Sequence, residues 1–254
     1  MRIILSGSAG HMGREVIASA GRQPGAEIVW GVDPGMPEGA EKASRDFAGC
    51  AAEADVIIDF SHHSATGALL AFARERKLPV VLATTGQTGE EAALIRDAAR
   101  HIPLFLAANY SLGIAVLTDL VKKALALYPD AEVEIVEQHH DRKLDAPSGT
   151  ALALFEAVRQ VRPEARAVCG RSGQGKRQPE DVGIHAIRMG NIVGVHEVII
   201  GTPNETLTLR HQAHSRGVFA DGSLKAAAFL LGKAPGLYDM KDLLLAGERA
   251  ENPG

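Results

Sequence analysis

The chain has 254 residues, 46% of them hydrophobic, and a formal net charge of −4. This length allows two domains with substantial cores, and the mild acidity offers no basic surface for nucleic acid or an anionic membrane. No apolar stretch is long enough to span a bilayer. The N-terminus resembles a core strand, not a leader peptide, and Cys50 and Cys169 lack metal-site spacing. We therefore expect a cytoplasmic protein with no nucleic-acid or membrane partner.

The N-terminal segment has the pattern of a dinucleotide-binding unit. Residues 2–6 form a predicted buried strand, a Gly-x-x-Gly-x-x-Gly loop occupies residues 7–13, and a helix is predicted from Arg14. Such a loop lets the backbone approach a pyrophosphate and places it at the helix N-terminus. A second strand, residues 26–32, ends at Asp33, where an acid usually holds a ribose 2′-hydroxyl. The segment predicts dinucleotide binding; the alternative is an ordinary strand–turn–helix unit.

The residues after Asp33 bear on the choice of nicotinamide cofactor. A 2′-phosphate normally needs an arginine or lysine near this strand end, but no basic residue lies between Asp33 and Lys42. The Asp33 carboxylate would repel the phosphate. The local charge therefore favours NADH, and NADPH is possible if Lys42 or Arg45 folds back.

Up to about residue 109, apolar strands alternate with helices, which predicts a parallel sheet covered on both faces. Ligands of such sheets bind beyond the C-terminal strand ends, where this chain places residues 61–63, 84–86 and 109–111. These small and polar side chains suit a nicotinamide ring and its ribose. The adjacent His62 and His63 have no cysteine or third histidine near them in sequence, so we expect no metal site.

A second candidate site lies in the middle of the chain. His139, His140 and Lys143 precede a Pro-Ser-Gly-Thr turn that opens an apolar helix from Ala151 to about Val158. The free N–H groups and the dipole of a helix N-terminus favour a carboxylate or phosphate, and imidazole and ammonium groups can donate protons. The pattern predicts a site for a small anionic substrate that needs a proton. The alternative is an amphipathic strand that ends in a polar loop.

The pattern changes in the second half of the chain. Residues 184–190, 193–201 and 205–214 are predicted strands whose short connections suit antiparallel neighbours. The glycine-rich, basic loop at residues 170–179 is either a lid over the site or a mobile surface loop. A helix is predicted over residues 219–231.

Residues 137–151 read E-Q-H-H-D-R-K-L-D-A-P-S-G-T-A and closely resemble the signature of the 4-hydroxy-tetrahydrodipicolinate reductase family, also called dihydrodipicolinate reductases. The resemblance covers nearly the whole chain. Further matches, in the family's order, lie in the glycine loop and at residues 59–61, 84–86, 107–111, 192–196 and 215–216. Two departures concern the cofactor: Ala83 stands where the family commonly has glycine, and no base directly follows Asp33.

This resemblance implies NAD(P)H-dependent reduction of 4-hydroxy-tetrahydrodipicolinate to tetrahydrodipicolinate, in the diaminopimelate route to lysine. His139 would donate or accept a proton, Lys143 would donate one, and Asp145 would fix the turn. The implied substrate-binding residues are His140, Ser148, Gly149, Thr150 and, on domain closure, Arg216. The cofactor-binding residues are predicted to be Gly7, Ser8, Ala9, Gly10, His11, Met12, Gly13, Asp33, Ala83, Thr84, Thr85, Ala107, Ala108, Asn109 and Tyr110.

The fold that the resemblance implies is α/β with two domains. Residues 1–110 and 216–254 would form a Rossmann-like parallel-sheet domain that binds the dinucleotide. Residues 111–215 would form a smaller α+β domain, with a mixed or antiparallel sheet, that binds the substrate and builds a homotetramer.

Two other functions are compatible with parts of the sequence. Another nicotinamide-dependent dehydrogenase of a small amino or imino acid would share the glycine loop and the acid, but not the His-His-x-x-Lys and Pro-Ser-Gly-Thr pairing. A non-catalytic NAD-binding sensor would need neither His139 nor Lys143.

Overall fold

The computed structural model describes residues 1–251 and the side chains of residues 1–247. The chain divides into two compact units, Met1–Leu112 with the segment from Arg216 onward, and Gly113–Ser215. The last three residues of the predicted segment 216–254 lie outside the described residues. Within the described part, no helix has both the length and the apolar character that a membrane span requires.

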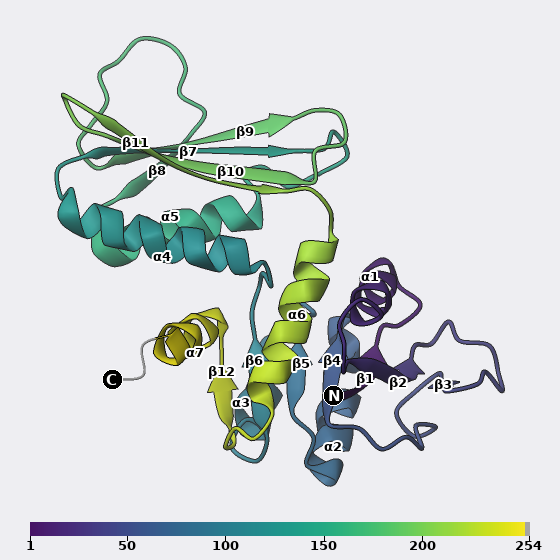
Figure 1. Ribbon diagram of the computed structural model, residues 1–254. Helices are drawn as coiled ribbons and strands as arrows, with labels where there is room; N and C mark the ends of the chain where they lie inside the picture. Colours follow the sequence, from purple (N-terminus) through teal and green to yellow (C-terminus); the bar gives the residue numbers. More distant parts are fainter. Residues whose placement is uncertain (252–254) are drawn as a thin grey trace. The chain divides into compact units, whose positions relative to one another are not determined.

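The first unit is built on a seven-stranded sheet in which all paired strands run parallel (Figure 1). Its strands are β1 (Arg2–Ser6), β2 (Glu27–Val32), β3 (Ala43–Ser44), β4 (Val56–Asp59), β5 (Val80–Leu82), β6 (Pro103–Leu106) and β12 (Gly236–Tyr238). The spatial order is β12-β6-β5-β4-β1-β2-β3. The strand order therefore proceeds toward one edge from β1 and toward the other edge from β4. In doubly wound sheets ligands bind at this switch point, beyond the carboxyl ends of the strands.

Helices cover both faces of this sheet. They are α1 (His11–Ala20), α2 (Thr66–Arg76), α3 (Gly89–Ala98), α6 (Gly217–Leu230) and α7 (Met240–Glu251), with a 3-10 turn, η1, at His63–Ala65. Side chains alternate along each strand, so Ile4 and Ile57 pack in the core beneath α2 and α3, whereas Ile3 and Ile58 pack with α1 and α6. The predicted parallel sheet with two buried faces is confirmed.

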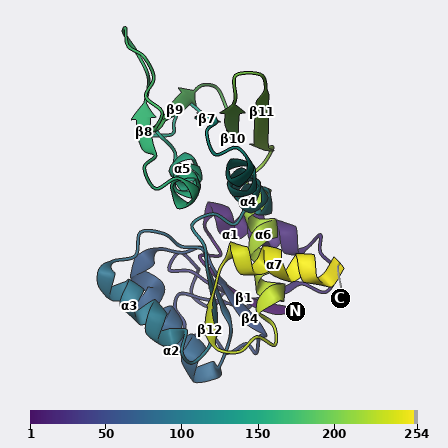
Figure 2. The ribbon, with the colours of Figure 1, turned by 90° about the vertical axis from the view of Figure 1, so that its left-hand side faces the viewer.

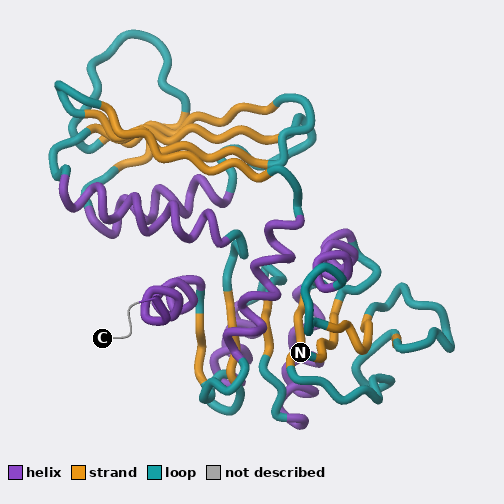
Figure 3. The backbone as a smooth tube through the Cα atoms, viewed as in Figure 1, coloured by secondary structure: helices purple, strands orange, loops and turns teal. Residues whose placement is uncertain are grey.

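The second unit contains a mixed five-stranded sheet (Figure 2). Its strands are β7 (Glu132–His139), β8 (Arg166–Cys169), β9 (Asp181–Arg188), β10 (Gly194–Gly201) and β11 (Thr206–Ala213), in the order β11-β10-β7-β9-β8. Helices α4 (Leu112–Leu127) and α5 (Gly149–Val161) lie side by side on one face (Figures 1 and 2). Val133 and Ile135 of β7 pack against Leu117 and Leu154 of these helices. The sheet's other face carries no helix within this unit (Figure 3).

One sequence-based expectation about this sheet is wrong. The short turn between β9 and β10 predicted antiparallel neighbours, but β7 lies between these two strands. β7 pairs parallel with β9 and antiparallel with β10. The expectation holds only for β10 and β11, which are antiparallel neighbours. A short connection limits the distance between two strands but does not prevent a third strand from pairing between them.

Candidate active site

The glycine loop of the first unit is shaped by two close backbone approaches. Gly7 has φ +78°, and a Cβ there would lie 2.5 Å from the carbonyl oxygen of Phe60, which follows β4. A Cβ on Gly13 would lie 2.2 Å from the Gly7 carbonyl oxygen. Glycine is therefore required at both positions, because a side chain on Gly7 would force apart the loops that follow β1 and β4, and one on Gly13 would collide with the glycine loop itself.

The N-terminus of α1 is suited to an anion. Its N-cap residue is Gly10, no side chain caps it, and its first turn has no acidic residue. Asp33 lies beside the loop, since its Oδ2 accepts a hydrogen bond from Ala9 N at 3.1 Å and its Oδ1 one from Gly35 N at 2.8 Å. The Ser8 hydroxyl is buried and has no hydrogen-bond partner among the described residues. Free N–H groups at a helix N-terminus and a nearby acid fit a dinucleotide's pyrophosphate and ribose.

A buried carboxylate organises the neighbouring strand ends. Asp59 is 1% exposed, and its oxygens accept hydrogen bonds from the hydroxyls of Ser61 and Thr84, each at 2.6 Å. Thr84 is a predicted cofactor-binding residue, but its hydroxyl ties the segment after β5 to β4. Tyr110 is also turned inward: its hydroxyl lies 2.9 Å from the Leu82 carbonyl oxygen, and burial raises the pKa of the Tyr110 phenol.

The remaining predicted cofactor residues differ in exposure. Those on the surface are His11, Thr85 and Ala108, whereas Met12, Ala83, Ala107 and Asn109 are half-buried. The histidine pair after β4 has a local structural role. The His62 ring accepts a hydrogen bond from Ser64 N at the start of η1, and His63 Nδ1 lies 3.0 Å from the Glu91 carboxylate. Glu91 itself forms a capping box with Thr88 at the start of α3.

The second unit places an imidazole and a carboxylate on the same face of β7. Glu137 is fully buried, and its Oε2 lies 2.6 Å from His139 Nδ1. The same carboxylate accepts hydrogen bonds from both terminal nitrogens of Arg188, at 2.8 and 2.6 Å, and from Ser148 N at 2.9 Å. Burial acts to raise the pKa of Glu137, but these hydrogen-bond donors outweigh it and hold the pKa below its usual value.

The other predicted residues of this unit lie at the start of α5. Gly149 is exposed, and a Cβ there would meet nothing within 4 Å, so the start of the helix is accessible, although the Gly149 N–H also bonds to the Asp145 carboxylate. Thr150 and His140 are half-buried. Lys143 Nζ lies 2.8 Å from Asp145 Oδ1, and this hydrogen bond lowers the pKa of Asp145.

Ser148, predicted to bind substrate, is buried behind this exposed helix end. It is 2% exposed, its hydroxyl accepts the Ala151 N–H as the N-cap of α5, and the same hydroxyl lies 3.2 Å from His196 Nε2. Because its N–H bonds to Glu137 and its carbonyl accepts the Leu152 N–H, every polar group of Ser148 is already used within the protein. The residue positions the helix N-terminus.

His196 of β10 belongs to the same group of side chains. It is 4% exposed, and its ring centroid lies 5.2 Å from that of His139. Burial, and secondarily the nearby charge of His139, lowers the pKa of His196 to about 4. The ring is therefore neutral at pH 7. Gly194 leaves room beside the His139 ring, since a Cβ on Gly194 would lie 3.3 Å from His139 Nε2.

Sequence reasoning gave no role to Glu137, Arg188 or His196. A signal was present for Glu137, because residues two apart on a strand share a face and Glu-x-His therefore places the two side chains together. Arg188 is paired with His139 in the register between β7 and β9, which the sequence does not reveal. Arg216 is the N-cap residue of α6 and belongs to the first unit, whereas His139 belongs to the second.

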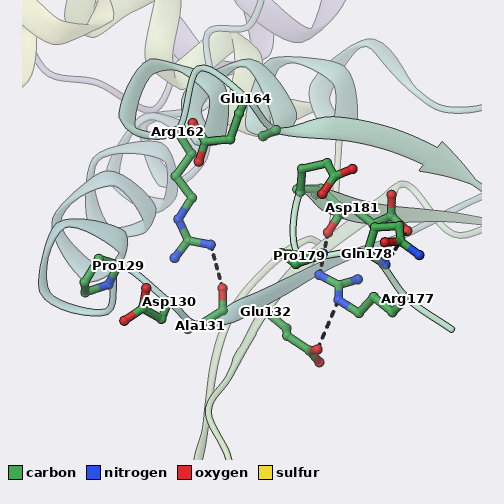
Figure 4. Close-up of a pocket in the computed structure, with 13 residues that line it drawn as sticks. Pro129, Asp130, Ala131, Glu132, Arg162, Glu164, Arg177, Gln178, Pro179 and Asp181 are labelled. Carbon is green, nitrogen blue, oxygen red and sulfur yellow. Dashed lines mark hydrogen bonds and ion pairs between the residues drawn. The ribbon is translucent and has the colours of Figure 1, made fainter.

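A separate hollow of about 490 Å³ opens at the other end of β7 (Figure 4). It is lined by Arg162, Arg177 and several carboxylates, but Arg162 is bonded to the Ala131 carbonyl and Arg177 to the Glu134 carboxylate. The 170–179 loop returns to this end of the sheet, where Asp181 binds Arg171 at 2.9 Å. His139 ends β7, whereas this hollow lies where β7 begins, so the loop is not anchored beside the predicted proton donors.

The first unit has the architecture of a dinucleotide-binding oxidoreductase, with the glycine loop, the open helix N-terminus and the acid at the expected strand ends. Two family models, described as dihydrodipicolinate reductase, N-terminus, and dihydrodipicolinate reductase, C-terminus, match residues 1–110 and 113–244. The chain therefore belongs to the dihydrodipicolinate reductase family, and it is an oxidoreductase that uses a nicotinamide dinucleotide.

Individual relatives agree with this assignment. The 4-hydroxy-tetrahydrodipicolinate reductase of Caldanaerobacter subterraneus subsp. tengcongensis is 47% identical over 97% of this chain and 99% of the relative. The enzyme of the same name from Clostridium tetani is 42% identical over 96% of this chain and 97% of the relative. The fold is also that of a dipicolinate-bound dihydrodipicolinate reductase from Paenisporosarcina sp. TG-14, whose structure has a TM-score of 0.80 at 22% identity, over 94% of this chain and 97% of that one. The predicted family, fold class and enzyme class are confirmed.

Proposed function

We propose that the chain reduces 4-hydroxy-tetrahydrodipicolinate to tetrahydrodipicolinate with NAD(P)H, in the diaminopimelate route to lysine. The names of the relatives support this reaction. The structural observation that carries it is that His139, through Glu137 and Ser148, and Lys143, through Asp145, are both linked to the exposed N-terminus of α5. This arrangement offers proton donors next to a site for a carboxylate, as reduction of a cyclic dicarboxylate requires.

The dinucleotide would bind to the first unit, and its nicotinamide supplies the hydride. The backbone of residues 7–13 and the N-terminus of α1 would hold the pyrophosphate. Asp33 would accept hydrogen bonds from the ribose hydroxyls, and its charge supports NADH as the preferred cofactor, with NADPH also possible. Thr84 would act through Asp59, and Tyr110 through its backbone, because both hydroxyls are committed within the protein.

The second unit would bind the substrate and handle protons. His139 would give or take a proton through Nε2, since Nδ1 faces Glu137. Lys143 would donate a proton, which the Asp145 carboxylate helps to orient. One substrate carboxylate would bind to the backbone of Gly149 and to Thr150 and His140, with Ser148 fixing the helix end. Arg216 is proposed as a further carboxylate ligand.

We also propose that the second unit forms a homotetramer through the sheet face that α4 and α5 leave uncovered. Side chains alternate across a strand, so Val136, Ile187 and Ile199 point to this face, opposite Ile135. Ile187 is 39% exposed in the single chain. Apolar side chains on an uncovered sheet face favour association. Light scattering on the purified protein tests the assembly.

The direct test of the reaction is a coupled assay with freshly made 4-hydroxy-tetrahydrodipicolinate, following the loss of nicotinamide absorbance with each cofactor. A panel of small amino and imino acids serves as the comparison. Turnover of the dicarboxylate alone supports the proposal. Turnover of another imino acid in its place would assign the chain to a different dehydrogenase activity, and binding of NADH without any turnover would favour a sensor.

A further inference from the structure

The buried carboxylate of Glu137 is bonded to three different residues. Its two oxygens accept four bonds: Oε2 from His139 Nδ1 and Arg188 Nη1, and Oε1 from Arg188 Nη2 and Ser148 N. The three residues come from the end of β7, the end of β9 and the start of α5. A single side chain thus joins the predicted proton donor to the helix end predicted to bind substrate.

The contact with His139 fixes which ring nitrogen carries a proton. A carboxylate with a lowered pKa is an acceptor only, so the neutral His139 ring must hold its proton on Nδ1. Nε2 is then the nitrogen that can exchange a proton with a ligand. Gly194 keeps the space at Nε2 open, since any side chain there would begin 3.3 Å from this atom.

We propose that Glu137 is a positioning residue that holds His139 in the tautomer with Nδ1 protonated. The proposal rests on the proposed function, in which His139 exchanges the proton. Arg188 neutralises the buried charge, and the Ser148 N–H locks the carboxylate against the N-terminus of α5, so the imidazole and the helix end keep a fixed separation. Glu137 touches neither reactant in this scheme and acts through His139.

The same strand offers a matched control. Glu134 also bonds an imidazole and a guanidinium: its oxygens lie 2.7 Å from His185 Nε2 and 2.6 Å from Arg177 Nη1. Glu134 is three residues from Glu137 and therefore points to the opposite face of the sheet, the one proposed to form the tetramer, so E134Q serves as the control once light scattering shows its assembly to be that of wild type. The variants E137Q and E134Q thus each remove one negative charge from the same strand. Only Glu137 is bonded to His139.

The test is a double-mutant cycle with His139→Ala. We expect E137Q to lower kcat by about 100-fold with the KM for NADH unchanged, and E134Q to keep kcat within about threefold of wild type. If Glu137 acts through His139, the E137Q/H139A double variant should be no slower than H139A alone, because residues that act as a unit are not additive. A double variant whose loss in kcat equals the product of the two single losses would overturn the proposal. So would an E137Q kcat close to that of wild type.

Removing a buried charge that faces Arg188 can prevent folding. The variant E137M/R188M replaces the whole ion pair with apolar side chains of similar length, and it provides a second route if E137Q is unstable. The same kcat loss and the same lack of additivity with H139A are expected for it.

The tautomer can be measured without any activity. In protein labelled with ¹⁵N-histidine, the signals of His139 are those missing from H139A. We expect a protonated Nδ1 and a bare Nε2 in the neutral wild-type ring, and loss of this pattern in E137M/R188M but not in E134Q. A wild-type ring protonated on Nε2 would refute the proposal. This readout stands even if the wild type fails to reduce 4-hydroxy-tetrahydrodipicolinate, which would instead remove the proposed function.

Discussion

Lys143 Nζ lies 2.8 Å from the Asp145 carboxylate, so the predicted proton donor is held by an acid two residues further along the same loop. The side chain of Lys143 is 23% exposed and that of Asp145 56% exposed. A pair this accessible contributes little to stability. Its consequence is positional: it restricts a long, flexible ammonium side chain to one place beside the start of α5.

Replacing Asp145 should therefore affect turnover more than stability. We expect D145N to lower kcat by about tenfold, because Lys143 loses its fixed position, and to shift Tm by no more than about 2 °C. The neighbouring variant D141N is the control, since Asp141 forms a similarly exposed ion pair with Arg142 at 2.8 Å. Equal kcat values for D145N and wild type would show that the ion pair does not position Lys143 for the reaction.

The two proton-donor candidates can be tested directly. H139A and K143A should each lower kcat by about 10²–10⁴-fold, the usual range for a general acid. NADH affinity, measured by fluorescence titration, should hardly change, because both residues lie in the second unit and the glycine loop lies in the first. H185A is a control, since His185 also pairs with a glutamate of β7, but on the opposite face of the sheet. Activity of H139A and K143A within about tenfold of wild type would remove both from the mechanism.

Local patterns predicted the elements that local chemistry determines. The glycine loop, the acid after β2 and the helix after Ser148 each depend on residues close together in the chain, and the structure contains all of them. The parallel sheet of the first unit was also predictable, because continuous apolar strands alternate with helices.

Features that depend on distant partners were missed. The insertion of β7 between β9 and β10 is determined by pairing across the sheet. Glu137 and Arg188 meet although 51 residues separate them. The inward direction of the Tyr110 and Ser148 hydroxyls follows from acceptors that the tertiary fold supplies. A motif indicates which residues matter, but it does not show which side chains point toward a ligand and which support those that do.

The buried, neutral His196 predicts a pH-dependent stability. Its pKa is about 4 in the folded protein, against about 6.5 in an unfolded chain. The unfolded state therefore binds more protons between these values, so stability is fully present above about pH 6.5 and is lost as the pH falls toward 4. H196Q should show a smaller loss of unfolding free energy between pH 7 and pH 5 than wild type, by about 1–2 kcal/mol.

Urea unfolding at several pH values measures this difference. H101Q is the control. Because His101 lies on the surface, this variant should have the same pH dependence of unfolding free energy as wild type. Both variants are compared at pH 7 first, so that any constant change in stability is subtracted. Parallel stability curves for wild type and H196Q would mean that His196 takes up its proton equally in the folded and unfolded states.

The last prediction concerns the cofactor, whose choice we expect to depend on the charge of Asp33. Two like charges about 4 Å apart cost on the order of 4 kcal/mol at an effective dielectric near 20, and solvent reduces this near the surface. We expect NADH to be favoured over NADPH in kcat/KM by about tenfold, or about 1.4 kcal/mol. The double variant D33S/P34R removes the repulsion and adds a partner for the 2′-phosphate, so it should move the preference toward NADPH.

Arg45 is the first residue to test as the source of any activity with NADPH. Its Nε donates to the Met36 carbonyl at 3.0 Å, which holds the guanidinium against the turn that follows Asp33. R45A should therefore raise the KM for NADPH and leave that for NADH unchanged, whereas R74A, on α2, should alter neither. A wild-type preference for NADPH that survives R45A would exclude Arg45 as the base that overrides Asp33 and leave Lys42 as the next one to test. Equal use of both cofactors by wild type and R45A would mean that the 2′ position is solvated and that Asp33 does not discriminate between them.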